Sequence, residues 1–157
     1  MEYLMTYGWA ILIVIIVAAA LYSLGIFNPA TWTGSRATGF TNMGAPAAGA
    51  WKLGANGAAD QFQLVLKNNL PSRISVTGVN VTIGITACDG EAINSVAVQG
   101  SGGIPEGIGT GFTVTANCGT QTAGSSYTST VSLTYNNLDT GLTALTESGS
   151  LTGTVTS

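Results

Sequence analysis

The order of apolar and polar residues divides this chain into two parts. Residues 4–27 form a predominantly apolar run that contains no Lys, Arg, Asp or Glu. About 20 apolar residues in a helix, at 1.5 Å per residue, are enough to cross the hydrocarbon core of a bilayer. Asn28 precedes Pro29, and a residue in that position is disfavoured in the helical region. The pattern therefore predicts a long hydrophobic helix over residues 1–28.

The second part of the chain alternates apolar and polar residues with period two, as half-buried strands do. The apolar positions change parity at Gly78, which predicts a β-bulge there. No helical pattern of any length follows Phe27. The predicted strands are 51–53, 61–67, 74–85, 93–98, 112–116, 127–135 and 151–155, with a weaker signal over 142–145.

Many short strands separated by Gly and Asn favour an antiparallel sandwich over a parallel sheet. We therefore expect an α+β chain, in which a long N-terminal hydrophobic α-helix precedes an all-β antiparallel, immunoglobulin-like sandwich. Its divisions would be the helix at 1–28, a linker and irregular start of the head at 29–49, and the β-sandwich head at 50–157.

Composition narrows the possible partners. Charged residues make up 7% of the chain and the formal net charge is -3, so no basic surface is expected for nucleic acid. Charge normally keeps a globular surface soluble and monomeric. A surface of Thr, Ser, Asn and Gly instead suits a protein that packs against copies of itself or carries glycans.

The scarcity of reactive side chains excludes several kinds of chemistry. The chain has no histidine, which excludes histidine acid–base catalysis and most zinc and copper sites. Gly107–Gly111 lacks the lysine of a P-loop, and Asp89-Gly90-Glu91 is better explained as a turn than as a calcium site. We predict no catalytic residue, no metal and no cofactor.

Cys88 and Cys118 are the only two cysteines of the chain. In a chain with an N-terminal hydrophobic segment, such a pair predicts a disulfide formed outside the cytoplasm. The alternative is two unrelated buried thiols.

Three explanations of the apolar run compete. A cleaved secretory signal needs a positively charged start and a core of about 7 to 15 apolar residues, and this run is longer and has no such start. A membrane anchor fits the length, but it normally has a flanking Lys or Arg that orients it. The third explanation is a pilin-type helix, which leaves the membrane to pack with sister helices in a filament.

The first twelve residues, Met-Glu-Tyr-Leu-Met-Thr-Tyr-Gly-Trp-Ala-Ile-Leu, resemble the N-terminal segment of archaeal type IV pilin-like proteins with class III signal peptides. In that family a prepilin peptidase cuts ahead of a Gln-x-x-x-Glu pattern, and Glu2 matches its glutamate. The resemblance covers about 25 residues and implies a mature or near-mature pilin chain with a β-sandwich head.

The resemblance implies roles for residues of the apolar run. Glu2 would meet a free α-amino group during assembly, although a solvated glutamate favoured by the helix dipole is an equal alternative. Apolar side chains would be buried against neighbouring helices in a fibre, or would face lipid in an anchor. These assembly-core residues are Leu4, Ile11, Leu12, Val14, Ile15, Ile16 and Leu21.

Asn80-Val81-Thr82 is the only Asn-x-Ser/Thr sequon in the chain. Alternation places Asn80 on the face opposite Val79 and Val81, so it is a candidate for N-glycosylation. Sequons also arise by chance.

These features together lead us to expect a structural subunit of an archaeal surface filament that serves adhesion or cell contact. Its implied partners are copies of itself and, before assembly, the prepilin peptidase, an assembly ATPase, a membrane platform protein and the cytoplasmic membrane. The alternatives are a membrane-anchored surface binding protein and a minor pilin. An enzyme is the least favoured class.

Overall fold

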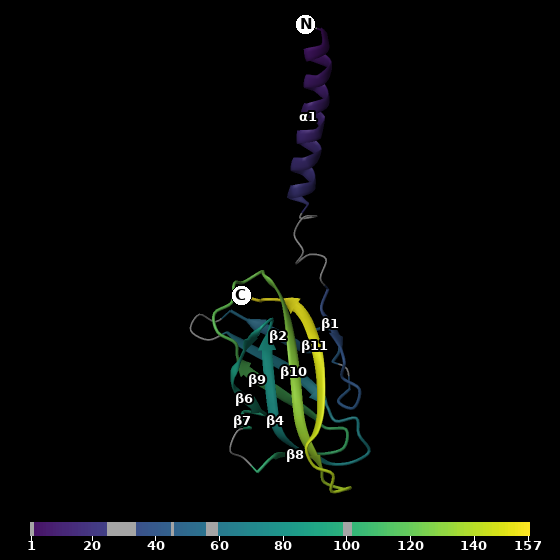
Figure 1. The fold of residues 1–157 in the computed structure, drawn as a ribbon, viewed down its shortest axis with the longest axis vertical. Coiled ribbons are helices and arrows are strands. Elements are labelled where there is room, and N and C mark those ends of the chain that lie inside the picture. Colours follow the sequence, from purple (N-terminus) through teal and green to yellow (C-terminus); the bar gives the residue numbers. More distant parts are fainter. Residues whose placement is uncertain (1, 25–33, 45, 56–59, 99–101) are drawn as a thin grey trace. The chain divides into compact units, whose positions relative to one another are not determined.

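The computed structural model describes residues 2–24, 34–44, 46–55, 60–98 and 102–157 (Figure 1). The chain divides into two compact units, Met1–Trp32 and Thr33–Ser157. The first unit contains helix α1, Glu2–Ser23, and the second is a β-rich head.

The expected α+β fold with a long helix is wrong. Helix α1 has 22 of the 157 residues, and it is the only helix in the described part of the chain. The structured remainder lies in two antiparallel sheets, so the protein is mainly β. The apolar run supports six turns of helix, whereas the long alternating segments that follow it form strands. The expected helix end at Asn28–Pro29 lies outside the described residues.

The head contains two antiparallel sheets that share one hydrophobic core, as the layers of a sandwich do. The first has the order β1-β11-β10-β4-β5, with β8 also paired to β4. Its strands are β1 (Arg36–Thr38), β4 (Ile74–Ile83), β5 (Thr86–Ala87), β8 (Ile104–Glu106), β10 (Ser126–Asn137) and β11 (Leu145–Thr154).

The second sheet has the order β2-β3-β9-β6-β7. Its strands are β2 (Trp51–Gly54), β3 (Gln61–Lys67), β6 (Asp89–Ile93), β7 (Val96–Ala97) and β9 (Gly111–Asn117). Inward positions such as Phe62, Leu64 and Leu66 on β3 are at most 1% exposed. The alternation in the sequence therefore identified the core face of this strand.

The parity change in β4 is confirmed as an irregularity of the ladder. Thr134 and Tyr135 of β10 are paired with Gly78 and Val76, so Thr77 has no partner in the register. An extra residue on one strand lets both halves of β4 turn apolar side chains toward the core. Val76 and Val81 are consequently both fully buried.

One predicted strand, 93–98, is a hairpin instead. Asn94 and Ser95 have φ values of 50° and 68°, and they connect β6 to β7. Two successive residues with positive φ give the type of turn that matches the twist of a hairpin. Apolar residues lie on both sides of this turn, at Ile93 and at Val96 to Val98, and the sequence analysis therefore read the segment as one strand.

The segment expected as linker and irregular start contributes to the head. β1 pairs with β11, and Phe40 and Met43 are buried in the core. Glu147 of β11 fixes this segment, because its Oε1 accepts the backbone N–H groups of Thr41, Asn42 and Met43 at 2.5, 2.7 and 3.2 Å. One buried carboxylate thus holds three consecutive backbone donors.

The Phe40 ring occupies the space above Gly149 on β11. A Cβ at Gly149 would lie 2.2 Å from Cε2 of Phe40, whereas a Cβ at Gly78 would meet nothing closer than 3.4 Å. Glycine is therefore required at 149 by the packed ring and is replaceable at 78.

We expect Gly149→Ala to lower the free energy of unfolding by about 1 to 3 kcal/mol, the usual cost of overpacking a core. Gly78→Ala is the matched control in the same sheet and should have a much smaller effect. Denaturant unfolding of the detergent-solubilised chain measures both. Equal effects of the two substitutions would contradict the packing argument.

Candidate functional site

Where its side chains are described, at residue 5 and over 7–23, helix α1 presents apolar side chains to solvent on every side, with no polar stripe. A helix on the surface of a globular protein normally has one apolar face. Leu21 is partly buried, and the predicted assembly residues Ile11, Leu12, Val14, Ile15 and Ile16 are between 52% and 67% exposed. The backbones of Glu2 and Leu4 belong to the helix, but their side chains lie outside the described residues.

Among the described residues, no helix is both long enough and apolar enough to cross a membrane.

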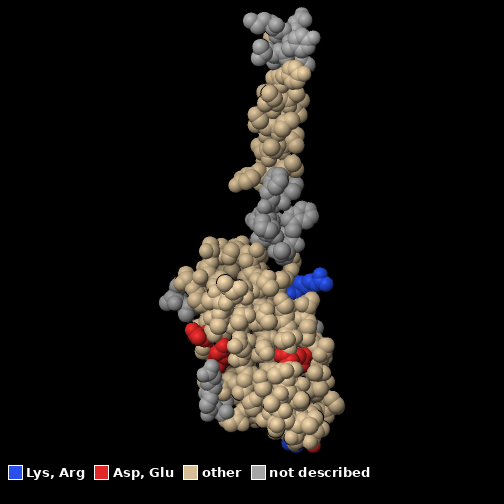
Figure 2. Space-filling view, in the orientation of Figure 1, with Lys and Arg blue, Asp and Glu red and all other residues tan. Residues whose placement is uncertain are grey.

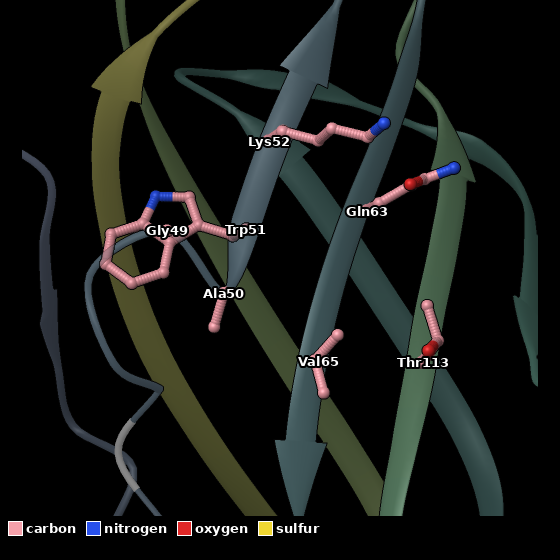
Figure 3. A pocket seen from close by; sticks show the side chains of 7 residues that line it. All are labelled: Gly49, Ala50, Trp51, Lys52, Gln63, Val65 and Thr113. Carbon is pink, nitrogen blue, oxygen red and sulfur yellow. The ribbon is translucent and has the colours of Figure 1, made fainter.

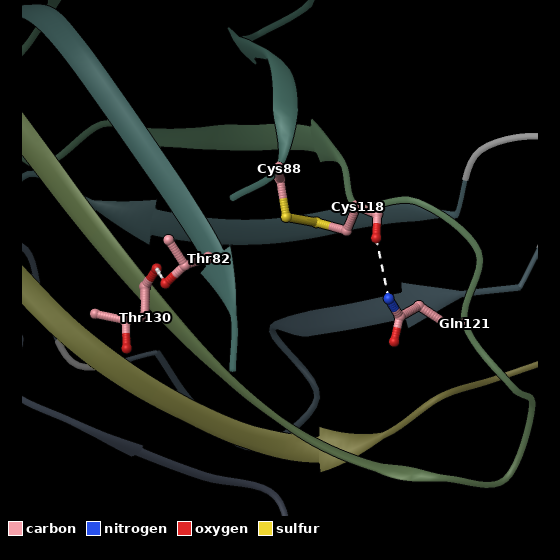
Figure 4. Close-up of a disulfide and its surroundings, with 5 residues drawn as sticks. All are labelled: Thr82, Cys88, Cys118, Gln121 and Thr130. Carbon is pink, nitrogen blue, oxygen red and sulfur yellow. Dashed lines mark hydrogen bonds between the residues drawn. A yellow bond between two sulfur atoms is a disulfide. The ribbon is translucent and has the colours of Figure 1, made fainter. Parts of the chain in front are cut away.

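The predicted disulfide between Cys88 and Cys118 is confirmed (Figure 4). Cys88 lies between β5 of the first sheet and β6 of the second, and Cys118 follows β9. The amide of Gln121 donates to the Cys118 carbonyl at 3.0 Å, and the Cys118 N–H donates to the Asp60 carbonyl. The bridge therefore ties the crossover between the sheets to a hydrogen-bonded loop.

Replacing both cysteines with serine should destabilise the head by about 3 to 4 kcal/mol, the chain-entropy value for a loop of this length. Thermal unfolding of the oxidised protein and the variant measures the difference. An identical melting curve, with both thiols open to alkylation in the parent protein, would contradict the structure.

Asn80 is exposed on β4, where its register partner on β10 is Ser132. Val81 beside it is fully buried and Val79 is partly buried. The side chain is therefore accessible, and its glycosylation stays a prediction.

Most carboxylates of the head are buried, and three of them, Asp60, Glu106 and Glu147, accept hydrogen bonds. Asp60, Glu91, Glu106 and Glu147 are each at most 8% exposed. The Asp60 carboxylate accepts a hydrogen bond from the backbone N–H of Gln121.

Within the described residues no group of three or more His, Cys, Asp or Glu side chains is placed to hold a metal ion. Of the two carboxylates considered for calcium, Asp89 is exposed and Glu91 is buried.

Glu106 connects the two sheets. It lies on β8, and its Oε1 accepts from Nδ2 of Asn94, in the β6–β7 turn, at 2.8 Å. Burial raises the pKa of the Glu106 carboxyl above its ordinary value of 4.5, and the weaker hydrogen bonds from Thr110 and Asn94 oppose the rise. A raised pKa in the folded state means that protonation of this group favours folding. Its contribution is complete below pH 4.5 and is lost as the pH rises through the folded-state value.

We expect Glu106→Gln to raise the melting temperature more at pH 7 than at pH 4, because glutamine removes the charge and keeps an acceptor for Asn94. Asp139→Asn is a control of opposite sign. Hydrogen bonds from the backbone and side chain of Arg73 lower the pKa of Asp139, so its contribution is present at neutral pH and lost in acid. A stabilisation by Glu106→Gln that does not change with pH would contradict the assignment.

A shallow open groove of about 230 Å³ lies on β2, β3 and β9 (Figure 3). The side chains of Lys52 and Gln63, which are register partners on β2 and β3, point in the same direction. Val65 and Thr113, partners on β3 and β9, continue the lining. The Trp51 indole closes the side nearest β11, where its Nε1–H donates to the Thr152 carbonyl at 3.1 Å.

Comparison with known proteins identifies no family for this chain. No family model and no curated protein matches it. Among solved structures, a crystal structure of BslA, described as a bacterial hydrophobin, matches at 17% sequence identity with a TM-score of 0.36. That match covers 69% of this chain and 97% of the BslA chain. A likeness at this level carries no argument about fold or function.

The sequence analysis did not find the groove. Its residues come from three strands and from the turn before β2, and they span positions 49 to 113 of the sequence. Lys52, Gln63 and Thr113 each occupy an ordinary outward position of an alternating strand. Only the pairing of β2 with β3 and of β3 with β9 brings them together.

Proposed function

We propose that this chain is a structural subunit of an archaeal type IV pilus-like surface filament and polymerises through α1. The observation that carries the proposal is the exposure of apolar side chains on all sides of this helix. Met5, Trp9 and Val14 are 82%, 71% and 67% exposed, although side chains of these kinds are normally inside a protein.

The absence of a polar stripe on α1 indicates how many other helices pack around it. A helix that packs against a single partner needs one apolar seam and keeps its other faces polar. Here apolar residues at successive positions, such as Ile11 to Val17, point in all directions around the axis. Because α1 has apolar side chains all around its axis, it favours a bundle of several identical helices over a two-helix coiled coil.

The free-energy cost of exposing α1 to water is large. A helix of this length and composition exposes on the order of 1,500 Å² of apolar area, worth tens of kcal/mol at about 25 cal/mol per Å². A monomer in water has no interaction that compensates the free-energy cost of exposing this apolar area. Assembly with copies of itself removes the area from water, and so does a lipid or detergent phase before assembly.

The head is consistent with a polymer. Four of its carboxylates are buried, and Asp139 pairs with Arg73 at 2.8 Å. Little charge therefore remains on the head to keep neighbouring copies apart, and the view in Figure 2 is largely free of charged side chains. Adhesion or cell contact, the proposed task of the filament, would fall to these exposed heads.

Replacing Val14 and Ile15 together with Asp should abolish filaments while the head stays folded, because an unpaired charge inside an apolar bundle costs several kcal/mol. Electron microscopy of filaments sheared from producing cells measures the yield, and peptide mass spectrometry identifies their main component. The matched control is Ile85→Asp. Ile85 lies in the β4–β5 turn of the head and is fully exposed.

Filaments of normal yield from the double variant would contradict the proposal. Loss of filaments from Ile85→Asp alone would place the polymer contacts on the head. If the unmodified chain is recovered only in the detergent-extracted membrane fraction, the protein does not polymerise.

The groove on β2, β3 and β9 favours a second candidate, a membrane-anchored surface protein whose head binds a ligand. The two candidates differ in the fate of α1, which would stay in lipid in the second. The filament assay separates them directly.

A further inference from the structure

The outward face of the second sheet carries a row of side chains along β3 that are polar except for one valine. Gln61, Gln63, Val65 and Lys67 alternate with buried residues on this strand. Gln63 is the register partner of Lys52 on β2, and Lys67 lies four residues further along β3. At about 3.4 Å per residue, the two ammonium-bearing residues stand about 14 Å apart along the strand. The groove begins at the Lys52 end and runs toward Lys67.

The charges on this face are all of one sign over three strands. Within the described residues the one ion pair is Arg73–Asp139, so Lys52 and Lys67 have no carboxylate partner there. The described parts of β2, β3 and β9 carry no Asp or Glu. Four of the six acidic residues of the head are buried, and the exposed Asp89 lies on β6, beyond β9. The β2–β3 part of this face is therefore positive, although the formal net charge of the chain is -3.

The lining of the groove selects among anionic ligands. Lys52 supplies an ammonium group, Gln63 an amide and Thr113 a hydroxyl, and these groups pair with carboxylates and with hydroxyls. The groove is shallow and open and Val65 is its large exposed aliphatic side chain, so it does not suit a lipid chain. The backbone of β3 is already paired on both edges, so an acidic peptide cannot add to it as a strand.

We propose that the β2-β3-β9 face binds an extended acidic polysaccharide along β3. Carboxylates of the polymer meet Lys52 and Lys67, and sugar hydroxyls between them meet Gln63 and Thr113. This site does not require assembly, because all its residues belong to one head. In a filament, repeated heads would bind the same polymer many times and raise its overall affinity.

The test measures binding of the full chain, in a detergent without a sugar head group, to hyaluronan oligosaccharides. Dextran oligosaccharides of matched length are the neutral comparison, and polyglutamate is the acidic comparison without sugar. Lys52→Gln and Lys67→Gln should each weaken hyaluronan binding about fivefold, the effect of one exposed charge pair. Arg36→Gln on β1 is the matched control, because it removes one exposed positive charge from the other sheet. All three side chains are exposed, so melting temperatures should stay unchanged.

Salt-sensitive binding of hyaluronan, weakened by both lysine variants and kept by Arg36→Gln, supports the proposal. Equal weakening by Arg36→Gln would show general charge attraction and overturn it. Binding of polyglutamate as tight as that of hyaluronan would overturn the assignment to carbohydrate. No binding of hyaluronan by the unmodified chain would overturn the site itself.

Discussion

The core shared by the two antiparallel sheets is the constraint on which the rest of the head depends. Each long strand places alternate side chains inward, and Phe62, Phe112 and Leu133 meet there with at most 1% exposure. Burial of these side chains stabilises the head at about 25 cal/mol per Å² of apolar area. Every outward position is then free to vary, and the two outer faces differ in chemistry. Thr and Ser predominate on β10 and β11, whereas lysine and glutamine occur on β2 and β3.

The segment that follows β11 connects the first sheet to β2, an edge strand of the second sheet. After β11, the Thr156 N–H donates to the Leu53 carbonyl of β2, and Thr156 in turn accepts from the N–H of Ala55. Trp51 donates to the Thr152 carbonyl just above this contact. An edge strand with free backbone groups is prone to pair with other chains. Here the residues that follow β11 cover part of the β2 edge, so this part of the edge is not free to pair with another chain.

The sequence predicted much of the head because alternation reports burial directly. It located the strands now seen as β2, β3, β4, β9, β10 and β11, and the parity change at Gly78 located the bulge. It failed where local geometry overrides the pattern. Asn94 and Ser95 turn the chain within an apolar segment, and β1 is too short to alternate. The disulfide followed from having only two cysteines. By contrast, the Glu147 contact with residues 41–43 spans more than 100 positions, and no local signal identifies such a pair.

The proposed polymerisation and the proposed ligand binding both depend on how charge is distributed over the head. A carboxylate buried as an acceptor stabilises the fold and at the same time removes negative charge from the surface. The described acids of the head are mostly used in this way, whereas Arg36, Lys52 and Lys67 are exposed. Heads with few surface charges repel one another weakly, which would permit the close spacing that the proposed bundle of α1 helices requires. The few positive charges that remain exposed attract an acidic ligand more effectively on such a surface, since neighbouring carboxylates do not compete for them.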